Sequence, residues 1–216
     1  MEEVRQSEKA PKGWPAALLL FHLGMWRERL RNALTNVSQD QPFEHPPRDV
    51  DELNNAELPE GIGTPLTDAA ARSDRLFGEI IDLYLRLGDR PFEWYAASNT
   101  TDAVLRNSYT HPRLHLSEYW KENGLPDRSA RLWEDALSDL RIAAAAPRFI
   151  VNAQYNLACV RVPQGRLDEA LQLLEEALPA SEVLRAAAPT DTDLAPLYED
   201  PRFQELVRPP SSPASS

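Results

Sequence analysis

The segment Ser108-Tyr-Thr-His-Pro-Arg-Leu-His-Leu-Ser-Glu-Tyr-Trp120 carries two of the four histidines of the chain, His111 and His115, four residues apart. Side chains at this spacing stand on the same face of a helix. A third histidine, His22, lies in the earlier stretch Leu18-Leu-Leu-Phe-His-Leu-Gly-Met-Trp26. Two imidazoles on one helix and a third from a neighbouring helix can bind a divalent metal ion and leave a coordination position open. We therefore expect a helical bundle built around these three histidines.

The composition narrows the class of protein. A chain of 216 residues with 42% hydrophobic side chains can bury a real core, as one large or two small domains. Its net charge of −11 argues against nucleic acid or an anionic membrane surface as partner. The start of the chain lacks the pattern of a secretion signal, and the apolar run Ala16–Phe21 is too short to span a bilayer. With the single Cys159 no intramolecular disulfide can form, and we expect a soluble, cytoplasmic protein.

Periodicity predicts an all-α fold. No segment shows the period-two alternation of a strand, whereas apolar residues recur every three or four positions along most of the chain. His22 itself lies on such an apolar stripe, and Gly88 fits the position after the end of a helix. The helices expected before Pro147 cover residues 14–37, 49–56, 64–87, 100–120 and 126–146. We expect these segments to form an up-down helical bundle over residues 13–146, after a disordered N-terminus at residues 1–12.

The pattern changes near Pro147. Asn152–Cys159 and Leu167–Ala177, joined by a link that contains Gly165, read as two antiparallel helices. This pair resembles the tetratricopeptide repeat at Ala158, Gly165, Ala170, Leu174 and Ala177, although the usual aromatic residue is missing at Gln154. The stretch 191–206 is similar to the acidic ending found behind bacterial repeats of this type, and we expect it to cap the pair. We therefore expect a tetratricopeptide-like segment over residues 147–208 and a disordered tail over residues 209–216.

Pro112 complicates the histidine pair. Proline disfavours helical geometry in the residue before it, lacks an amide donor, and clashes with the carbonyl group four residues back, here that of Ser108. Either the helix kinks at this point, or a new helix begins at Pro112 with His111 as its cap. In both cases the shared face of His111 and His115 needs a structural test.

The N-terminal part, roughly residues 13 to 145, resembles the DinB-like superfamily of bacterial four-helix-bundle metalloproteins. The resemblance rests on a histidine in the first helix, in Phe21-His-Leu-Gly-Met-Trp-Arg-Glu-Arg-Leu30, and on the His-x-x-x-His pair late in the bundle. The first segment and Asp51-Glu-Leu-Asn54 are similar to the branch related to cyclopropane-hydrolase self-resistance proteins. The resemblance implies a divalent metal ion, zinc or nickel, with His22, His111 and His115 as its ligands.

The resemblance also implies chemistry with small molecules. A metal-bound water would give a hydrolase, and a metal-bound low-molecular-weight thiol would give a transferase that attacks an electrophile. Cys159 lies in the repeat and is a poor nucleophile, so the thiol would be a co-substrate. Polar partners near the pocket could come from Arg29, Glu52, Asn54 and Glu118, whereas His45 lies in a proline-rich loop.

Two alternatives stay open. A histidine on an apolar helix face can simply be a hydrogen-bonded core residue, in which case there is no metal site. The chain could also be a non-catalytic interaction module that docks a protein partner through its tetratricopeptide-like segment.

Overall fold

The computed structural model describes residues 13–45 and 49–208. Its contacts divide the chain into two compact units, unit 1 (Met1–Asn123) and unit 2 (Gly124–Ser216). The predicted all-α class is confirmed, because helices dominate both units and one small two-stranded sheet is the only sheet in the described part. Among the same residues, no helix is both long and apolar enough to cross a membrane.

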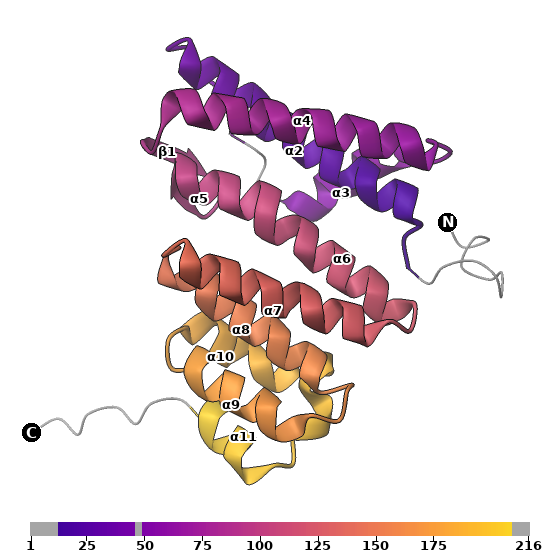
Figure 1. Cartoon of the computed structure of the whole chain (residues 1–216), viewed down its shortest axis with the longest axis vertical. Coiled ribbons are helices and arrows are strands. Elements are labelled where there is room, and N and C mark those ends of the chain that lie inside the picture. Colours follow the sequence, from indigo (N-terminus) through magenta and orange to yellow (C-terminus); the bar gives the residue numbers. More distant parts are fainter. Residues whose placement is uncertain (1–12, 46–48, 209–216) are drawn as a thin grey trace, which may run out of the picture. The chain divides into compact units, whose positions relative to one another are not determined.

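Unit 1 contains three long helical segments and a hairpin (Figure 1). Its elements are α2 (Ala16–Ser38), α3 (Val50–Glu57), η1 (Leu58–Gly61), α4 (Leu66–Leu87), β1 (Pro91–Trp94), β2 (Ala97–Asn99), α5 (Thr100–Val104), η2 (Leu105–Thr110) and α6 (His111–Glu122).

Helices α2 and α4 lie side by side and run in the same direction (Figure 1). Arg27 of α2 donates to the Ser73 hydroxyl at 2.7 Å, and one turn later Arg31 pairs with Glu79 at 3.3 Å, so residue numbers rise together along both helices. This differs from the strict up-down alternation expected from the sequence. The link that contains α3 and η1 returns the chain to the starting end, and the segment from α5 to α6 then runs antiparallel to α2.

The core of unit 1 lies near the end of α2. Leu30 and Leu34 pack there with Ile80 of α4 and with Phe92 and Trp94 of the hairpin. The sequence did not predict this hairpin, because its strands are too short for alternation to be recognised. It begins just after Gly88, whose φ of 64° ends α4 in a conformation that favours glycine.

The chain passes Pro112 through a wide helical turn. Residues of η2 form a π-helix, and α6 follows directly, with His111 itself in helical conformation (φ −58°, ψ −46°). A π turn holds more residues than an α turn, so the helix continues although Pro112 provides no amide donor. His111 is thus part of the helix rather than its cap, and it shares α6 with His115.

Unit 2 is a layered set of shorter helices. Its elements are α7 (Pro126–Ile142), α8 (Pro147–Arg161), α9 (Leu167–Ala177), α10 (Glu182–Ala187), η3 (Ala188–Thr190), η4 (Thr192–Leu197) and α11 (Pro201–Val207). Helices α8 and α9 form the expected pair, and Gly165 makes the turn between them with a φ of 72°. Ala158, Ala170 and Leu174 are fully buried in its core.

The segment after α9 completes this core. Leu194, Leu197 and Phe203 bury their side chains against the helix pair, as expected for a cap. The division between the units falls after Asn123, whereas the sequence placed a boundary after residue 146. The reason is that α7 packs on α8 and buries Trp133 and Leu140.

Candidate metal centre

The three predicted histidines meet in unit 1. His22 lies on the second turn of α2 and is 1% exposed, whereas His111 and His115 on the first turns of α6 are half-buried. The antiparallel crossing of α2 with α6 brings together residues that are 89 and 93 positions apart. The π turn before α6 leaves both of its histidines on the face that meets α2.

Their Nε2 atoms form a small triangle. The Nε2 of His22 lies 3.2 Å from that of His111 and 3.1 Å from that of His115, and the remaining side of the triangle measures 2.9 Å. Each imidazole therefore points the same nitrogen toward one common point.

Hydrogen bonding alone cannot satisfy this triangle. In a neutral imidazole one nitrogen is a donor and the other an acceptor, so each Nε2 is either one or the other. Among three atoms with two available roles, at least one pair has the same role, which places two lone pairs or two N–H groups about 3 Å apart. A cation that accepts all three lone pairs removes this conflict.

The spacing also suits metal ligation. Imidazole nitrogens bind zinc at about 2.0–2.1 Å, so two of them on one ion lie about 3.0 Å apart at a right angle and about 3.4 Å apart at a tetrahedral angle. The three observed separations lie in or just below this range. We conclude that the residues present fit a single divalent cation.

The protonation states agree with this fit. Burial, followed by the charge of His115, lowers the pKa of His22 to about 3. Burial also lowers the pKa of His111 well below its usual range and lowers the pKa of His115, although the carboxylate of Glu118 acts in the opposite direction on the latter. All three imidazoles are therefore neutral near pH 7, which is the form that binds metal.

Two tryptophans enclose the histidines. Trp14 stacks on His115 with ring centres 5.8 Å apart and meets His22 edge-on at 5.2 Å. Trp26 lies one turn after His22, and its ring centre is 6.4 Å from that of His111. The indole Nε1 of Trp26 donates to the side chain of Asn54 at 3.1 Å, which fixes its orientation.

The other polar residues expected near the site have different roles. Asn54 orients Trp26 rather than a ligand, and Arg29 pairs with Glu57. Glu118 pairs with Lys121 at 2.9 Å, and its charge reaches His115. Glu52 and His45 are exposed, and His45 packs on Phe43, 4.9 Å between ring centres.

No pattern in the sequence indicated that one further residue, Tyr95, lies near the site. Tyr95, in the turn of the hairpin, packs edge-on against Trp26 with ring centres 5.5 Å apart. The hairpin that carries it was not predicted, so no sequence signal linked Tyr95 to the histidines.

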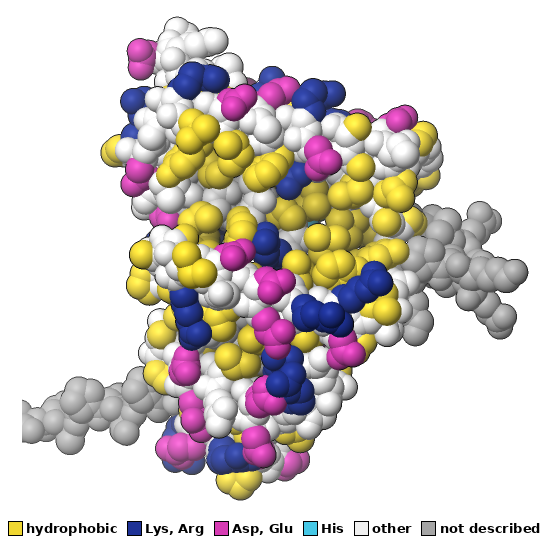
Figure 2. Space-filling model, viewed as in Figure 1, with side chains coloured by type: hydrophobic (Ala, Val, Ile, Leu, Met, Phe, Trp, Pro, Cys, Tyr) yellow, Lys and Arg dark blue, Asp and Glu magenta, His cyan; other side chains and the backbone are white. Residues whose placement is uncertain are grey.

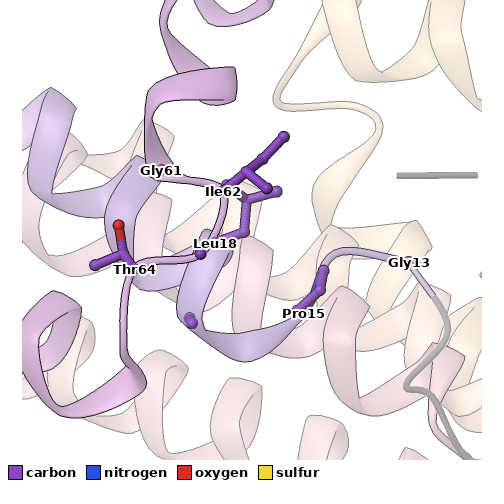
Figure 3. Close-up of a pocket in the computed structure, with 8 residues that line it drawn as sticks. Gly13, Pro15, Leu18, Gly61, Ile62 and Thr64 are labelled. Carbon is purple, nitrogen blue, oxygen red and sulfur yellow. The ribbon is translucent and has the colours of Figure 1, made fainter. Parts of the chain in front are cut away.

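A small apolar cavity of about 150 Å³ lies at the start of α2. Figure 3 shows residues of its wall, among them Pro15 and Leu18 from the start of α2 and Ile62 and Thr64 from the loop before α4. Gly13 and Pro15 line the cavity, and Trp14 lies between them in sequence and covers His115. The cavity has no titratable lining residue, so it offers space rather than chemistry.

Unit 2 holds a second group of side chains with metal-binding atoms, Cys159, Asp191 and Asp193. Here the polar atoms already have partners. Asp191 accepts the Tyr155 hydroxyl at 2.7 Å, the Cys159 thiol at 3.8 Å and the backbone amide of Asp193 at 3.1 Å. These contacts make Asp191 the cap of η4, and Cys159 is a buried core residue, as its position in the repeat suggested.

The geometry of unit 1 thus identifies a candidate site without help from relatives. Comparisons of the chain with models of protein families, with curated proteins and with solved structures found no match.

Proposed function

We propose that the chain is a metal-dependent enzyme that binds one divalent cation, zinc or nickel, through His22, His111 and His115. The observation that carries the proposal is the triangle of Nε2 atoms, whose hydrogen-bonding roles cannot all be satisfied without a cation. The resemblance of roughly residues 13 to 145 to the DinB-like superfamily supports the same ligand set. Imidazole ligands alone do not choose between the two metals.

The three ligands would have unequal tasks. His22 is buried on every side and would anchor the ion to α2, whereas His111 and His115 leave part of their surface open to solvent. A substrate would therefore approach from the side of α6. Figure 2 shows a hollow in unit 1 that is lined mainly by hydrophobic side chains, with basic side chains beside it.

The reaction class follows from an open coordination position. A divalent cation held by three neutral imidazoles would acidify a bound water or thiol, so that either becomes a nucleophile near neutral pH. The single cysteine of the chain, Cys159, is buried in the core of unit 2. We therefore propose a hydrolase, or a transferase in which a low-molecular-weight thiol attacks an electrophilic small molecule. Trp14 and Trp26 would exclude water from the buried side.

An interaction module is a weaker proposal. The small residues of the helix pair, such as Ala158 and Ala170, pack inside unit 2. They give no support to a peptide groove.

Elemental analysis of the purified protein, reconstituted with zinc or nickel and then freed of excess metal, tests the proposal. We expect one equivalent per chain in the wild type and almost none in His22→Ala, His111→Ala or His115→Ala. His45→Ala is the matched control and should keep the full equivalent, and circular dichroism should show that all variants are folded. A wild-type protein that retains no metal after reconstitution would contradict the proposal.

A further inference from the structure

Tyr95 carries a buried hydroxyl group with no hydrogen-bond partner among the described residues. Burial raises the pKa of this hydroxyl to about 12, although Arg29 and Arg106 act in the opposite direction. A phenol that stays protonated is a donor that needs an acceptor, and an unpaired buried donor is costly.

The backbone of Tyr95 is also unusual. Trp94 pairs with Ala97, so Tyr95 and Ala96 form the turn of the hairpin, and only Tyr95 has a positive φ, of 53°. Two-residue turns with positive φ at the first position ordinarily have glycine there. A bulky residue held in this conformation is strained, and such strain is found mainly at functional sites.

The ring of Trp26 links Tyr95 to the candidate metal centre. Tyr95 packs against Trp26, and the ring of Trp26 lies 6.3 Å from His22 and 6.4 Å from His111. One indole ring therefore contacts both the tyrosine and two of the three histidines.

Arg106 contributes a positive charge at the same place. Its guanidinium carbon lies 5.9 Å from the centre of the Tyr95 ring, and its charge also lowers the pKa of His111. Arg106 belongs to the π turn that leads into α6, is exposed, and forms no ion pair in the part of the chain that the structure describes. Arg29, the other cation near Tyr95, is already paired with Glu57.

We propose that Tyr95 and Arg106 bind a carboxylate group of the substrate beside the metal held by His22, His111 and His115. A carboxylate supplies the acceptor that the Tyr95 hydroxyl lacks and the anion that Arg106 lacks. The proposal rests on the proposed function and narrows it to small molecules, or thiol co-substrates, that carry a carboxylate. The hydroxyl and the guanidinium are positioning groups here and take no part in bond making.

The cobalt-substituted protein offers a direct test, because thiolate binding to cobalt gives a visible absorption band. We would titrate it with 3-mercaptopropionate and with 2-mercaptoethanol. Both carry a thiol, but only 3-mercaptopropionate carries a carboxylate. We expect the wild type to bind 3-mercaptopropionate about tenfold more tightly, the size of one charge-assisted hydrogen bond. Equal affinity for the two thiols would overturn the proposal.

Two variants separate this site from simple chelation of cobalt by the carboxylate. Tyr95→Phe and Arg106→Gln should each remove most of the preference and leave 2-mercaptoethanol binding unchanged. Arg75→Gln is the matched control, since Arg75 is exposed on α4 and pairs with the nearby Glu79, its only ion-pair partner among the described residues. A preference that survives in both site variants is chelation alone and overturns the proposal.

A metal-free arm distinguishes failure of the anion site from failure of the metal site. The indole N–H signal of Trp26 should shift on titration with propionate, but not with the uncharged propionamide, and the shift should vanish in Tyr95→Phe and Arg106→Gln. A wild-type protein that binds no cobalt but shows this shift would contradict the proposed function and support the anion site. Cobalt binding without any effect of propionate would support the metal site and overturn the anion site.

Discussion

The described residues contain two groups of side chains whose metal-binding atoms lie close together, one in each unit, and the two differ in what their polar atoms already do. In unit 2 the Asp191 carboxylate accepts from a hydroxyl, a thiol and a backbone amide. In unit 1 the three histidine Nε2 atoms face only one another. In both groups the metal-binding atoms lie close together. Only the histidines of unit 1 lack a set of hydrogen bonds that satisfies all of these atoms.

The difference follows from the chemistry of the side chains. A carboxylate has several acceptor sites and no donor, so it is satisfied by surrounding donors and serves as a helix cap. Three imidazoles aimed at one point have no such solution. The proposed metal site is therefore the group in unit 1, and the group in unit 2 has a structural role.

Metal binding should have the largest effect and should be confined to unit 1. Zinc at a thousand times its dissociation constant is expected to stabilise the native state by about 4 kcal/mol, because it binds the folded site only. Hydrogen exchange followed by mass spectrometry should show this protection in peptides of α2 and α6, and a chelator should reverse it. Protection centred on peptides around Asp191 would place the metal in unit 2 and contradict the proposed site.

Acid should weaken the metal-free protein through the same histidines. The pKa of a histidine in an unfolded chain is about 6.5, whereas the pKa of His22 in the folded protein is lowered to about 3. Between these values the unfolded chain binds more protons, so the free energy of unfolding falls as the pH falls below 6.5.

Urea unfolding at pH 7 and pH 5 measures this effect. We expect a loss of about 2 kcal/mol for each histidine that stays neutral in the folded protein. His22→Gln should flatten the dependence, and His45→Gln is the control for the loss of one exposed histidine. The same slope in all three proteins would show that the triangle does not control the titration.

Removing the negative charge of Asp191 in unit 2 should lower the free energy of unfolding without changing the affinity for metal. Asp191→Asn weakens the acceptor of Tyr155 and Cys159, and we expect a loss of about 1–3 kcal/mol in the free energy of unfolding. Zinc affinity, measured by competition with a chromophoric chelator, should be unchanged. Glu175→Gln, an exposed change on α9, serves as the control for the loss of one negative charge.

The smallest expected change in stability should distinguish a tyrosine whose hydroxyl is hydrogen-bonded, Tyr155, from one whose hydroxyl has no partner among the described residues, Tyr95. Tyr155→Phe removes a hydroxyl that donates to Asp191 and should cost about 1 kcal/mol, whereas Tyr95→Phe removes an unpaired hydroxyl and should be neutral or slightly stabilising. Thermal unfolding in the absence of ligand compares the two variants. An equal loss in both would mean that the Tyr95 hydroxyl has a partner in the native protein.

Much of the fold could be read from local patterns. The apolar period of residues 64–87 and the glycine at position 88 predicted α4 to within two residues at its start, because side-chain period and backbone caps are properties of nearby residues. The helix pair around Gly165 followed from small residues at matching positions. The hairpin with Phe92 and Trp94 escaped prediction, because its short strands are stabilised by the core that they enter.

The sequence also gave no warning of how Pro112 is accommodated. Its two expected solutions were a kink or a new helix capped by His111, and the chain instead passes through the π turn of η2. The parallel course of α2 and α4 was equally hidden, since the direction of a helix depends on where its link returns the chain.

The residues alone indicated that the chain is helical, that His22 lies on an apolar face and that His111 and His115 stand four positions apart, because periodicity and spacing are local properties. It took the folded structure to show that the three Nε2 atoms converge and that the carboxylate oxygens of Asp191 already accept hydrogen bonds. It also placed Tyr95 against Trp26, which contacts His22 and His111, and Arg106 against Tyr95. The convergence of the histidine Nε2 atoms could not be predicted locally, because it depends on the crossing of α2 and α6. That crossing is set by packing between residues far apart in the chain.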